Sequence, residues 1–201
     1  MSIALLDYGA GNVASVERAL RRLGAESHPA MLPSDLANAN AIILPGVGHF
    51  AALIRALDER RLRGPLTTAI RSGVPFLGIC LGLQALYERS EEAPEFAGLA
   101  IFAGEVRALP STVKLPHMGW NRIRVSRRSG LLDKLSESDF FYFAHTFAAT
   151  ELSPEVVATC DHGAPFTAVL QSENVFGVQF HPEKSGTPGA RVLQNFLRLA
   201  A

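Results

Sequence analysis

Three continuous apolar runs constrain the fold of this 201-residue sequence more than any other feature. They span residues 3–6, 41–44 and 75–79, and each is followed by a breaker-rich or glycine-containing turn. Apolar residues then recur at helical spacing after each turn. Uninterrupted apolar strands with helical crossovers are covered on both faces, so the pattern predicts a mainly parallel sheet flanked by helices.

The expected helices and the later strands complete one α/β domain over residues 1–201. Helical spacing covers residues 13–23 before a capping Gly24, then residues 50–57, 81–88 and 189–199. Beyond Gly98 the pattern changes to short strands separated by turns. These runs are residues 123–125, 140–143, 156–159, 166–170 and 175–180.

Composition narrows the class of protein. Apolar residues make up 48% and charged residues 19%, which excludes a disordered or coiled-coil chain. The 19 basic and 19 acidic residues cancel, so we expect neither nucleic acid nor an anionic membrane as partner. No basic segment precedes Asp7, and polar residues interrupt the uncharged stretch 36–54, so we expect no secretory leader or membrane span. Two cysteines suit a reducing cytoplasm.

The segment Gly78–Gly82 has the form of a nucleophile elbow with Cys80 at its centre. Such a turn strains the central residue, and its neighbours two positions away must lack bulky side chains. The helix that follows directs free N–H groups at the sulfur and favours the reactive thiolate. The alternative is a structural cysteine between two packing glycines. Cys160 has no such frame and is expected to be a buried core residue.

His181 and Glu183 are the candidate base and its orienting group. They follow the predicted strand 175–180, and residues two apart in an extended segment point to the same side. Glu183 would then hold one nitrogen of His181 while the other faces Cys80. The alternative is a surface turn with a solvated carboxylate. The other histidines fit turn, packing or binding positions better: His28, His49, His117, His145 and His162.

The segment 45–48, Pro-Gly-Val-Gly, is a candidate oxyanion site. Its N–H groups, together with that of Leu81, would stabilise a tetrahedral oxyanion, and the alternative is an ordinary strand-to-helix loop. The segment 9–12 lacks the third glycine of a dinucleotide fingerprint, so we reject that reading. No metal-ligand spacing appears and no organic cofactor is required.

These motifs together resemble the class I, triad-type glutamine amidotransferases, and more specifically the glutaminase subunits of imidazole glycerol phosphate synthase. The elbow is shared by the whole class, whereas the opening turn, the Pro-Gly-Val-Gly strand and the His-Met-Gly-Trp-Asn segment mark this family. The matching segments are residues 7–12, 45–50, 78–84, 116–121, 142–145 and 181–185. The resemblance implies the class I amidotransferase fold, a mainly parallel central sheet with a smaller antiparallel region.

The resemblance also implies catalytic roles. Cys80 would attack the side-chain amide of glutamine, His181 would pass the proton to ammonia, and Glu183 would orient His181. A γ-glutamyl thioester would form, and water would then release glutamate. The N–H groups of Val47 and Leu81 would form the oxyanion hole.

Glutamine recognition is implied for Gly48, Gln84, Glu92 and the segment 146–147, which includes Thr146. The family usually has a tyrosine where this chain has Phe147, so a hydroxyl contact is lost there.

A partner is implied because no synthase domain accompanies the glutaminase to use the ammonia. Ammonia becomes ammonium in water and loses its nucleophilicity, so it must pass through a protected route. The family's partner is a (β/α)₈-barrel cyclase, which forms imidazole glycerol phosphate and an aminoimidazole carboxamide ribonucleotide in histidine biosynthesis. The interface residues implied by family position are Asn12, Trp120, Tyr142 and Lys184.

Members of this family resemble switches whose oxyanion strand is misaligned until the cyclase binds its ligand. Gly46 and Gly48 make a peptide rotation cheap, so we expect weak activity of the chain alone. Three alternatives remain: the glutaminase subunit of another synthase, a stand-alone γ-glutamyl thiol hydrolase, and a non-catalytic binding module.

Overall fold

The computed structural model describes residues 1–9, 12–150 and 153–201. In its N-terminal part, strands and helices alternate as the sequence predicts. The elements there are β1 (Ile3–Leu6), α1 (Val13–Arg22), β2 (Ser27–Ala30), the 3-10 turn η1 (Pro33–Leu36), β3 (Ala41–Gly46), α2 (Phe50–Glu59), α3 (Arg63–Arg71), β4 (Phe76–Cys80) and α4 (Leu81–Gln84).

The remainder of the chain consists mainly of strands and ends in a helix. The elements are β5 (Tyr87–Ser90), β6 (Phe102–Ala108), β7 (His117–Asn121), β8 (Arg124–Val125), η2 (Gly130–Leu132), β9 (Phe141–His145), β10 (Phe147–Ala149), β11 (Val156–Asp161), β12 (Pro165–Ser172), β13 (Val175–Val178), η3 (Pro182–Lys184) and α5 (Gly186–Leu199).

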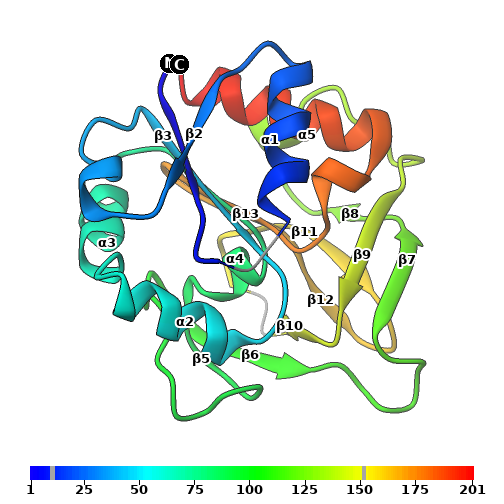
Figure 1. Cartoon of the computed structure of the whole chain (residues 1–201). Helices are drawn as coiled ribbons and strands as arrows, with labels where there is room; N and C mark the ends of the chain where they lie inside the picture. The colour runs from blue at the N-terminus through cyan, green and yellow to red at the C-terminus, as the bar shows by residue number, and fades with distance from the viewer. Residues whose placement is uncertain (10–11, 151–152) are drawn as a thin grey trace.

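A mixed sheet organises the molecule (Figure 1). Over the described ranges it contains eight strands in the order β2-β1-β3-β4-β13-β12-β11-β8. The pairs from β2 to β13 are parallel, and β12, β11 and β8 continue the sheet antiparallel. Two smaller sheets, β10-β6-β5 and β7-β9, lie beside it. The predicted α/β class, with a mainly parallel sheet and a smaller antiparallel region, is confirmed.

Alternate residues of the parallel strands enter two separate cores. Ile3 and Leu5 pack with apolar residues of α1 and α5, whereas Ala4 and Leu6 pack with those of α2, α3 and α4. Figure 1 shows α1 and α5 on one side of the sheet and α2 and α3 on the other. Covering both faces explains why these strands read as continuous apolar runs rather than alternating ones.

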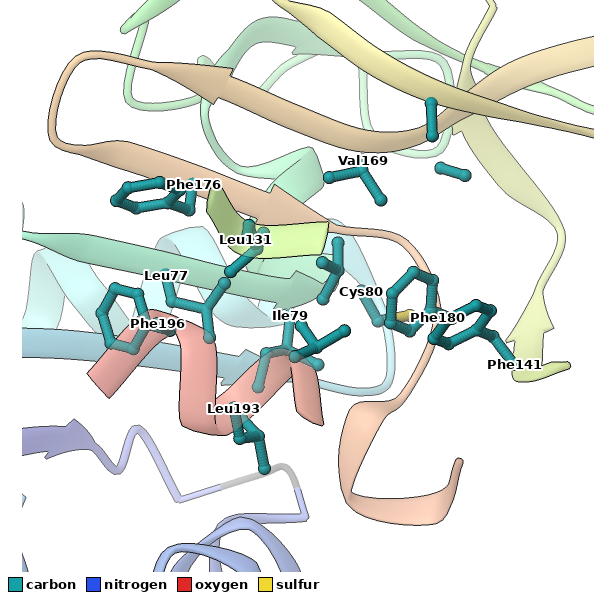
Figure 2. Close-up of a cluster of buried hydrophobic side chains, with 14 of the residues drawn as sticks. Leu77, Ile79, Cys80, Leu131, Phe141, Val169, Phe176, Phe180, Leu193 and Phe196 are labelled. Carbon is teal, nitrogen blue, oxygen red and sulfur yellow. The ribbon is translucent and has the colours of Figure 1, made fainter. Parts of the chain in front are cut away.

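Helix α5 closes one of these cores over the strand that carries Cys80. Figure 2 shows Leu193 and Phe196 of α5 facing Leu77 and Ile79 of β4 in one buried cluster. Packing against α5 therefore fixes the carboxyl end of β4. Because Cys80 is the last residue of β4, this packing sets where the sulfur lies.

Two expected boundaries are wrong. The helix predicted over residues 81–88 ends at Gln84, because Tyr87 turns into β5 and pairs with Phe102 of β6. The turn expected at Pro45 and Gly46 instead continues β3, where these residues pair with Ile79 and Cys80. In both places a pairing between distant segments overrides the local pattern.

Several elements carry too little local signal to be predicted. Strand β2 reads Ser-His-Pro-Ala and has no apolar run, although it forms the parallel edge of the sheet. Helix α3, β5, β6, β7 and β10 were not predicted either. Over the described residues, no helix is long and apolar enough to cross a membrane.

Candidate active site

Cys80 lies in a strained turn between β4 and α4. Its backbone φ is 54° and ψ is −108°, a left-handed conformation that a non-glycine residue seldom adopts. A Cβ atom on Gly78 would lie 2.5 Å from the Gly82 oxygen, and one on Gly82 would overlap the Leu44 oxygen. Both glycines are therefore required sterically. A structural cysteine gives no reason for such strain, whereas a nucleophile elbow does.

His181 and Glu183 form a buried pair. His181 Nδ1 lies 3.0 Å from Glu183 Oε1, and the two side chains are 3% and 1% exposed. We had predicted an extended segment through Glu183, but this prediction is wrong, because η3 begins at Pro182. It is this 3-10 turn, rather than strand alternation, that brings the carboxylate back to the ring.

Backbone and hydroxyl contacts hold this turn against β9. The backbone N–H of His181 donates to the backbone carbonyl oxygen of Tyr142 at 2.8 Å, and the Ser185 hydroxyl donates to the backbone carbonyl oxygen of His181 at 2.6 Å. The same Ser185 hydroxyl accepts from the Tyr142 N–H at 2.9 Å. These contacts fix His181 without using its ring, which stays available for chemistry.

The charges around His181 favour its protonated form. Burial alone lowers the pKa of the imidazole, but the charge and hydrogen bond of Cys80 and those of Glu183 outweigh it, and the pKa rises to about 10. Since Nδ1 faces Glu183, Nε2 is the nitrogen directed to Cys80. The geometry fits an imidazolium between a thiolate and a carboxylate.

Asn12 contacts the carboxylate of Glu183. Its Nδ2 donates to Glu183 Oε1 at 3.2 Å, the same oxygen that meets His181. Within the described part of the chain, Glu183 Oε2 is buried without a hydrogen-bond partner. Asn12, which the resemblance implies is an interface residue, therefore also helps to orient the carboxylate. Residues 10–11 of the opening turn lie outside the described residues.

A cavity of about 190 Å³ opens beside Cys80. It brings together Cys80, both residues expected at the oxyanion hole and all four expected at glutamine, with further residues from β7 and β9. Its lining consists of Val47, Gly48, Cys80, Leu81, Gln84, Glu92, Pro116, Met118, Ala144, His145, Thr146 and Phe147.

The polar groups of the cavity are held in defined orientations. Gln84 Nε2 donates to the Phe147 oxygen at 2.7 Å and to Gln179 Oε1 at 3.2 Å, so Gln84 Oε1 is the atom that remains for a ligand. Phe147 takes part through its carbonyl, so this contact needs no tyrosine hydroxyl. Glu92 Oε2 accepts from the Phe50 N–H at 2.7 Å, at the start of α2.

The N–H group expected to serve as an oxyanion donor is already occupied. The Val47 N–H donates to Tyr8 Oη at 3.2 Å, and the Tyr8 hydroxyl donates to the Val47 oxygen at 3.2 Å. Burial raises the pKa of Tyr8 to about 12 and outweighs the hydrogen bond to Val47, which lowers it, so the phenol stays protonated. The Val47 peptide is thus held by a neutral hydroxyl.

The two glycines that flank Val47 differ in freedom. A Cβ atom on Gly46 would lie 2.6 Å from Leu81 Cβ, so this glycine allows close packing against the elbow. Gly48 has a φ of 99° and open space around its Cα. Packing therefore limits substitution at Gly46, and the positive φ limits it at Gly48.

Three of the expected interface residues form one exposed cluster. The Trp120 and Tyr142 rings are 5.9 Å apart in a T-shaped arrangement, and Lys184 Nζ lies 5.6 Å from the Tyr142 ring. Trp120 is 56% exposed and Met118, on the same strand, is 65% exposed. Large exposed apolar side chains next to an active site are typical of a binding surface.

The sequence did not predict that His117 and His145, which were expected at packing or binding positions, form a buried pair at the cavity. His145 Nδ1 lies 2.9 Å from the Phe147 oxygen, and His145 Nε2 lies 3.1 Å from His117 Nδ1. A carbonyl only accepts, so His145 carries its proton on Nδ1 and His117 donates to Nε2. Burial lowers the pKa of His117 to about 4 and that of His145 to about 3, which keeps both neutral.

Gln179 and Tyr8 were also missed, although the sequence marks both. Gln179 is a polar residue inside an apolar strand that leads to His181, and Tyr8 stands in the breaker-rich turn after β1. Cys160 is buried as predicted, and burial raises the pKa of its thiol to about 12. Over the described residues, no group of three or more His, Cys, Asp or Glu side chains is placed to hold a metal ion.

Comparisons with known proteins show the family to which the chain belongs. The model of the family "Glutamine amidotransferase class-I" matches residues 4–200. The imidazole glycerol phosphate synthase subunit HisH of Moorella thermoacetica is 44% identical over 96% of this chain and 93% of its own, and that of Methanothermobacter thermautotrophicus is 43% identical over 98% of both.

Solved structures support the fold alone. A glutamine amidotransferase crystal structure has a TM-score of 0.79 at 21% identity, covering 98% of both chains. The PurLQS structure from Thermotoga maritima has a TM-score of 0.76 at 21% identity, covering 98% of this chain and 97% of that one. Identity above 40% over nearly the full length is found with the HisH subunits. The chain belongs to the class I glutamine amidotransferases and, among them, to the family of the HisH subunits of imidazole glycerol phosphate synthase.

Proposed function

We propose that residues 1–201 form one glutaminase domain that hydrolyses glutamine through Cys80, His181 and Glu183. The observation that carries the proposal is the strained Cys80 at the mouth of a cavity, next to a buried His181–Glu183 pair. This arrangement supplies a nucleophile, a proton carrier and an orienting carboxylate in one place.

The reaction starts with the attack of the Cys80 sulfur on the side-chain amide carbon of glutamine. The carbon–nitrogen bond of the resulting tetrahedral intermediate breaks, and ammonia leaves with a proton from the His181 Nε2–H group. A γ-glutamyl thioester remains on Cys80. Water then attacks the thioester while His181 takes up its proton, and glutamate leaves as the thiolate is restored. Glu183 and Asn12 keep the imidazole in the required orientation.

Glutamine recognition is assigned to groups that line the cavity. Gln84 Oε1 is available to accept from the substrate amino group, because both Nε2 hydrogens are used within the protein. Thr146, Gly48 and Glu92 line the same cavity. The Leu81 N–H, at the start of α4, faces the developing oxyanion together with the Val47 N–H once that group is released.

The ammonia passes to a cyclase subunit of the (β/α)₈-barrel type, with which the chain forms a heterodimer in histidine biosynthesis. The exposed cluster of Trp120, Tyr142 and Lys184 supports a docking surface here. Tyr142 connects this cluster to the triad, because its backbone carbonyl oxygen accepts from the backbone N–H of His181. The two cysteines are unpaired, which suits work in the reducing cytoplasm.

The isolated chain is expected to be a weak glutaminase because Val47 donates to Tyr8 rather than to an oxyanion. Binding of the liganded cyclase would release this N–H and complete the oxyanion hole. One missing donor of this kind typically costs about 10²–10³ in rate.

The test is glutamate release from glutamine by the purified chain, measured alone and with the cyclase and its ribonucleotide. We expect slow release alone and strong activation in the complex. Cys80→Ala should abolish the activated rate, whereas Cys160→Ala, at the other buried cysteine, should retain it. Equal activity with and without the cyclase would favour a stand-alone hydrolase. Activity that survives Cys80→Ala would refute the catalytic assignment.

A further inference from the structure

Gln179 is a fully buried polar residue next to the proposed nucleophile. It follows β13, whose Val178 pairs with Ile79 of β4, so continuing the parallel register by one residue places Gln179 beside Cys80. Its side chain has no exposed surface. An amide is costly to bury unless its polar atoms are paired, so its partners indicate what the residue does.

The two polar atoms of Gln179 have different partners. Its Nε2 lies 3.5 Å from Cys80 Sγ, and its Oε1 accepts from Gln84 Nε2 at 3.2 Å. Gln84 Nε2 is in turn fixed by the Phe147 oxygen, which only accepts. This chain of contacts determines the orientation of both amides, and it leaves Gln179 as a donor to the sulfur.

The apolar residues on either side of Gln179 pack into the core. Phe176, Val178 and Phe180 enter the apolar cluster that also contains Cys80, as Figure 2 shows for Phe176 and Phe180. Alternation turns Gly177 and Gln179 to the opposite face, where a Cβ atom on Gly177 would lie 2.5 Å from Leu83 Cδ1. This face is therefore tightly packed against α4, and the Gln179 amide on it meets the sulfur.

We propose that Gln179 is a catalytic residue whose Nε2–H group stabilises the Cys80 thiolate, and that Gln84 orients it for this task. The proposal rests on the proposed function of Cys80. A hydrogen bond from a neutral donor to a charged acceptor is about twice as strong as one between neutral groups. Because Gln84 also lines the glutamine cavity, the same residue that meets the substrate holds the donor on the nucleophile.

The test is the pH dependence of alkylation of Cys80 by iodoacetamide in the full chain, read by peptide mass spectrometry. Gln179→Met keeps the length of the side chain and removes the donor, and Gln179→Leu removes it with a smaller side chain. We expect the midpoint of the alkylation profile to move up by about one pH unit in both variants. At a pH below the midpoint, the rate should fall about tenfold.

The matched control is Gln171→Met. Gln171 lies on the neighbouring strand β12, where it pairs with Phe176 and its Oε1 accepts from the Ser129 hydroxyl. Its alkylation profile should coincide with that of the unmodified chain. A purely structural role for Gln179 would change the stability of the fold but not the position of this profile.

A wild-type profile in either folded Gln179 variant would overturn the proposal. The two variants differ in volume, so a failure of one to fold leaves the other to decide, and circular dichroism establishes which is folded. Failure of the proposed function is recognised separately, because glutamate release in the cyclase complex would then survive Cys80→Ala. The alkylation result is read on the thiol itself and does not depend on that release.

Discussion

Replacing Tyr8 by phenylalanine tests whether its hydroxyl holds the oxyanion donor out of use. The Tyr8 hydroxyl makes two hydrogen bonds of 3.2 Å, one from the Val47 N–H and one to the Val47 oxygen. Tyr8→Phe removes both while it keeps the ring in the apolar cluster around α2. The Gly46–Val47 peptide, which carries the N–H, and the Val47–Gly48 peptide, which carries the oxygen, then both lose their partner in the resting conformation. Each of these peptides adjoins a glycine, so rotation is then favoured.

The size of the effect follows from these two hydrogen bonds. Each contributes about 0.5–1.5 kcal/mol net, so their loss favours the rotated peptide by about 1–3 kcal/mol. That range corresponds to a shift of about 5-fold to 150-fold in the population of the competent state. Because water replaces part of the lost bonding, we expect glutamate release by the isolated chain to rise about tenfold.

The assay compares glutamate release by Tyr8→Phe and the unmodified chain, each alone and with the liganded cyclase. The rate of the complex should change little, since the donor is already released there. Tyr87→Phe is the matched control, because Tyr87 is a second buried tyrosine and lies on β5. An unchanged or lower rate for folded Tyr8→Phe alone would refute the proposed role of its hydroxyl.

Three further predictions concern packing, docking and pH. Gly82→Ala should destabilise the fold by about 3 kcal/mol in denaturant unfolding, since its methyl group would overlap a β3 carbonyl, whereas Gly64→Ala, in open space, should not. Trp120→Ala should weaken cyclase binding about thirtyfold in calorimetry, and equal affinity would remove it from the interface. The free energy of unfolding should fall as the pH drops from about 6.5 towards 4, because His117 and His145 bind protons in the unfolded chain but stay neutral in the folded one. Each histidine contributes a slope of up to about 1.4 kcal/mol per pH unit. The slope measured by denaturant unfolding should therefore be shallower in His145→Asn.

The residues of the proposed triad could be selected from the sequence because their local motifs are sterically demanding. Only glycine fits at Gly78 and Gly82 once Cys80 takes a positive φ, so the elbow is written in five consecutive residues. His181 and Glu183 are separated by a single proline, which makes their association local as well. The mainly parallel sheet was predictable for a similar reason, because burial on both faces leaves continuous apolar runs.

Contacts between distant segments could not be read in the same way. The length of α4, the strand β2 and the partner of Asn12 all depend on groups far away in the chain. The contact between His181 and Glu183 was expected from the sequence, but the 3-10 turn that produces it was not.

The sequence by itself determined the fold class and pointed to the proposed nucleophile and its two supporting residues, because short-range sterics and burial patterns specify the fold and the motifs. Only the tertiary structure decided which groups surround them. It placed Tyr8 on the Val47 peptide and Gln179 on the Cys80 sulfur, across 39 and 99 residues of chain. These contacts arise because parallel strands β1, β3, β4 and β13 end at one edge of the sheet, where segments without any local relation meet.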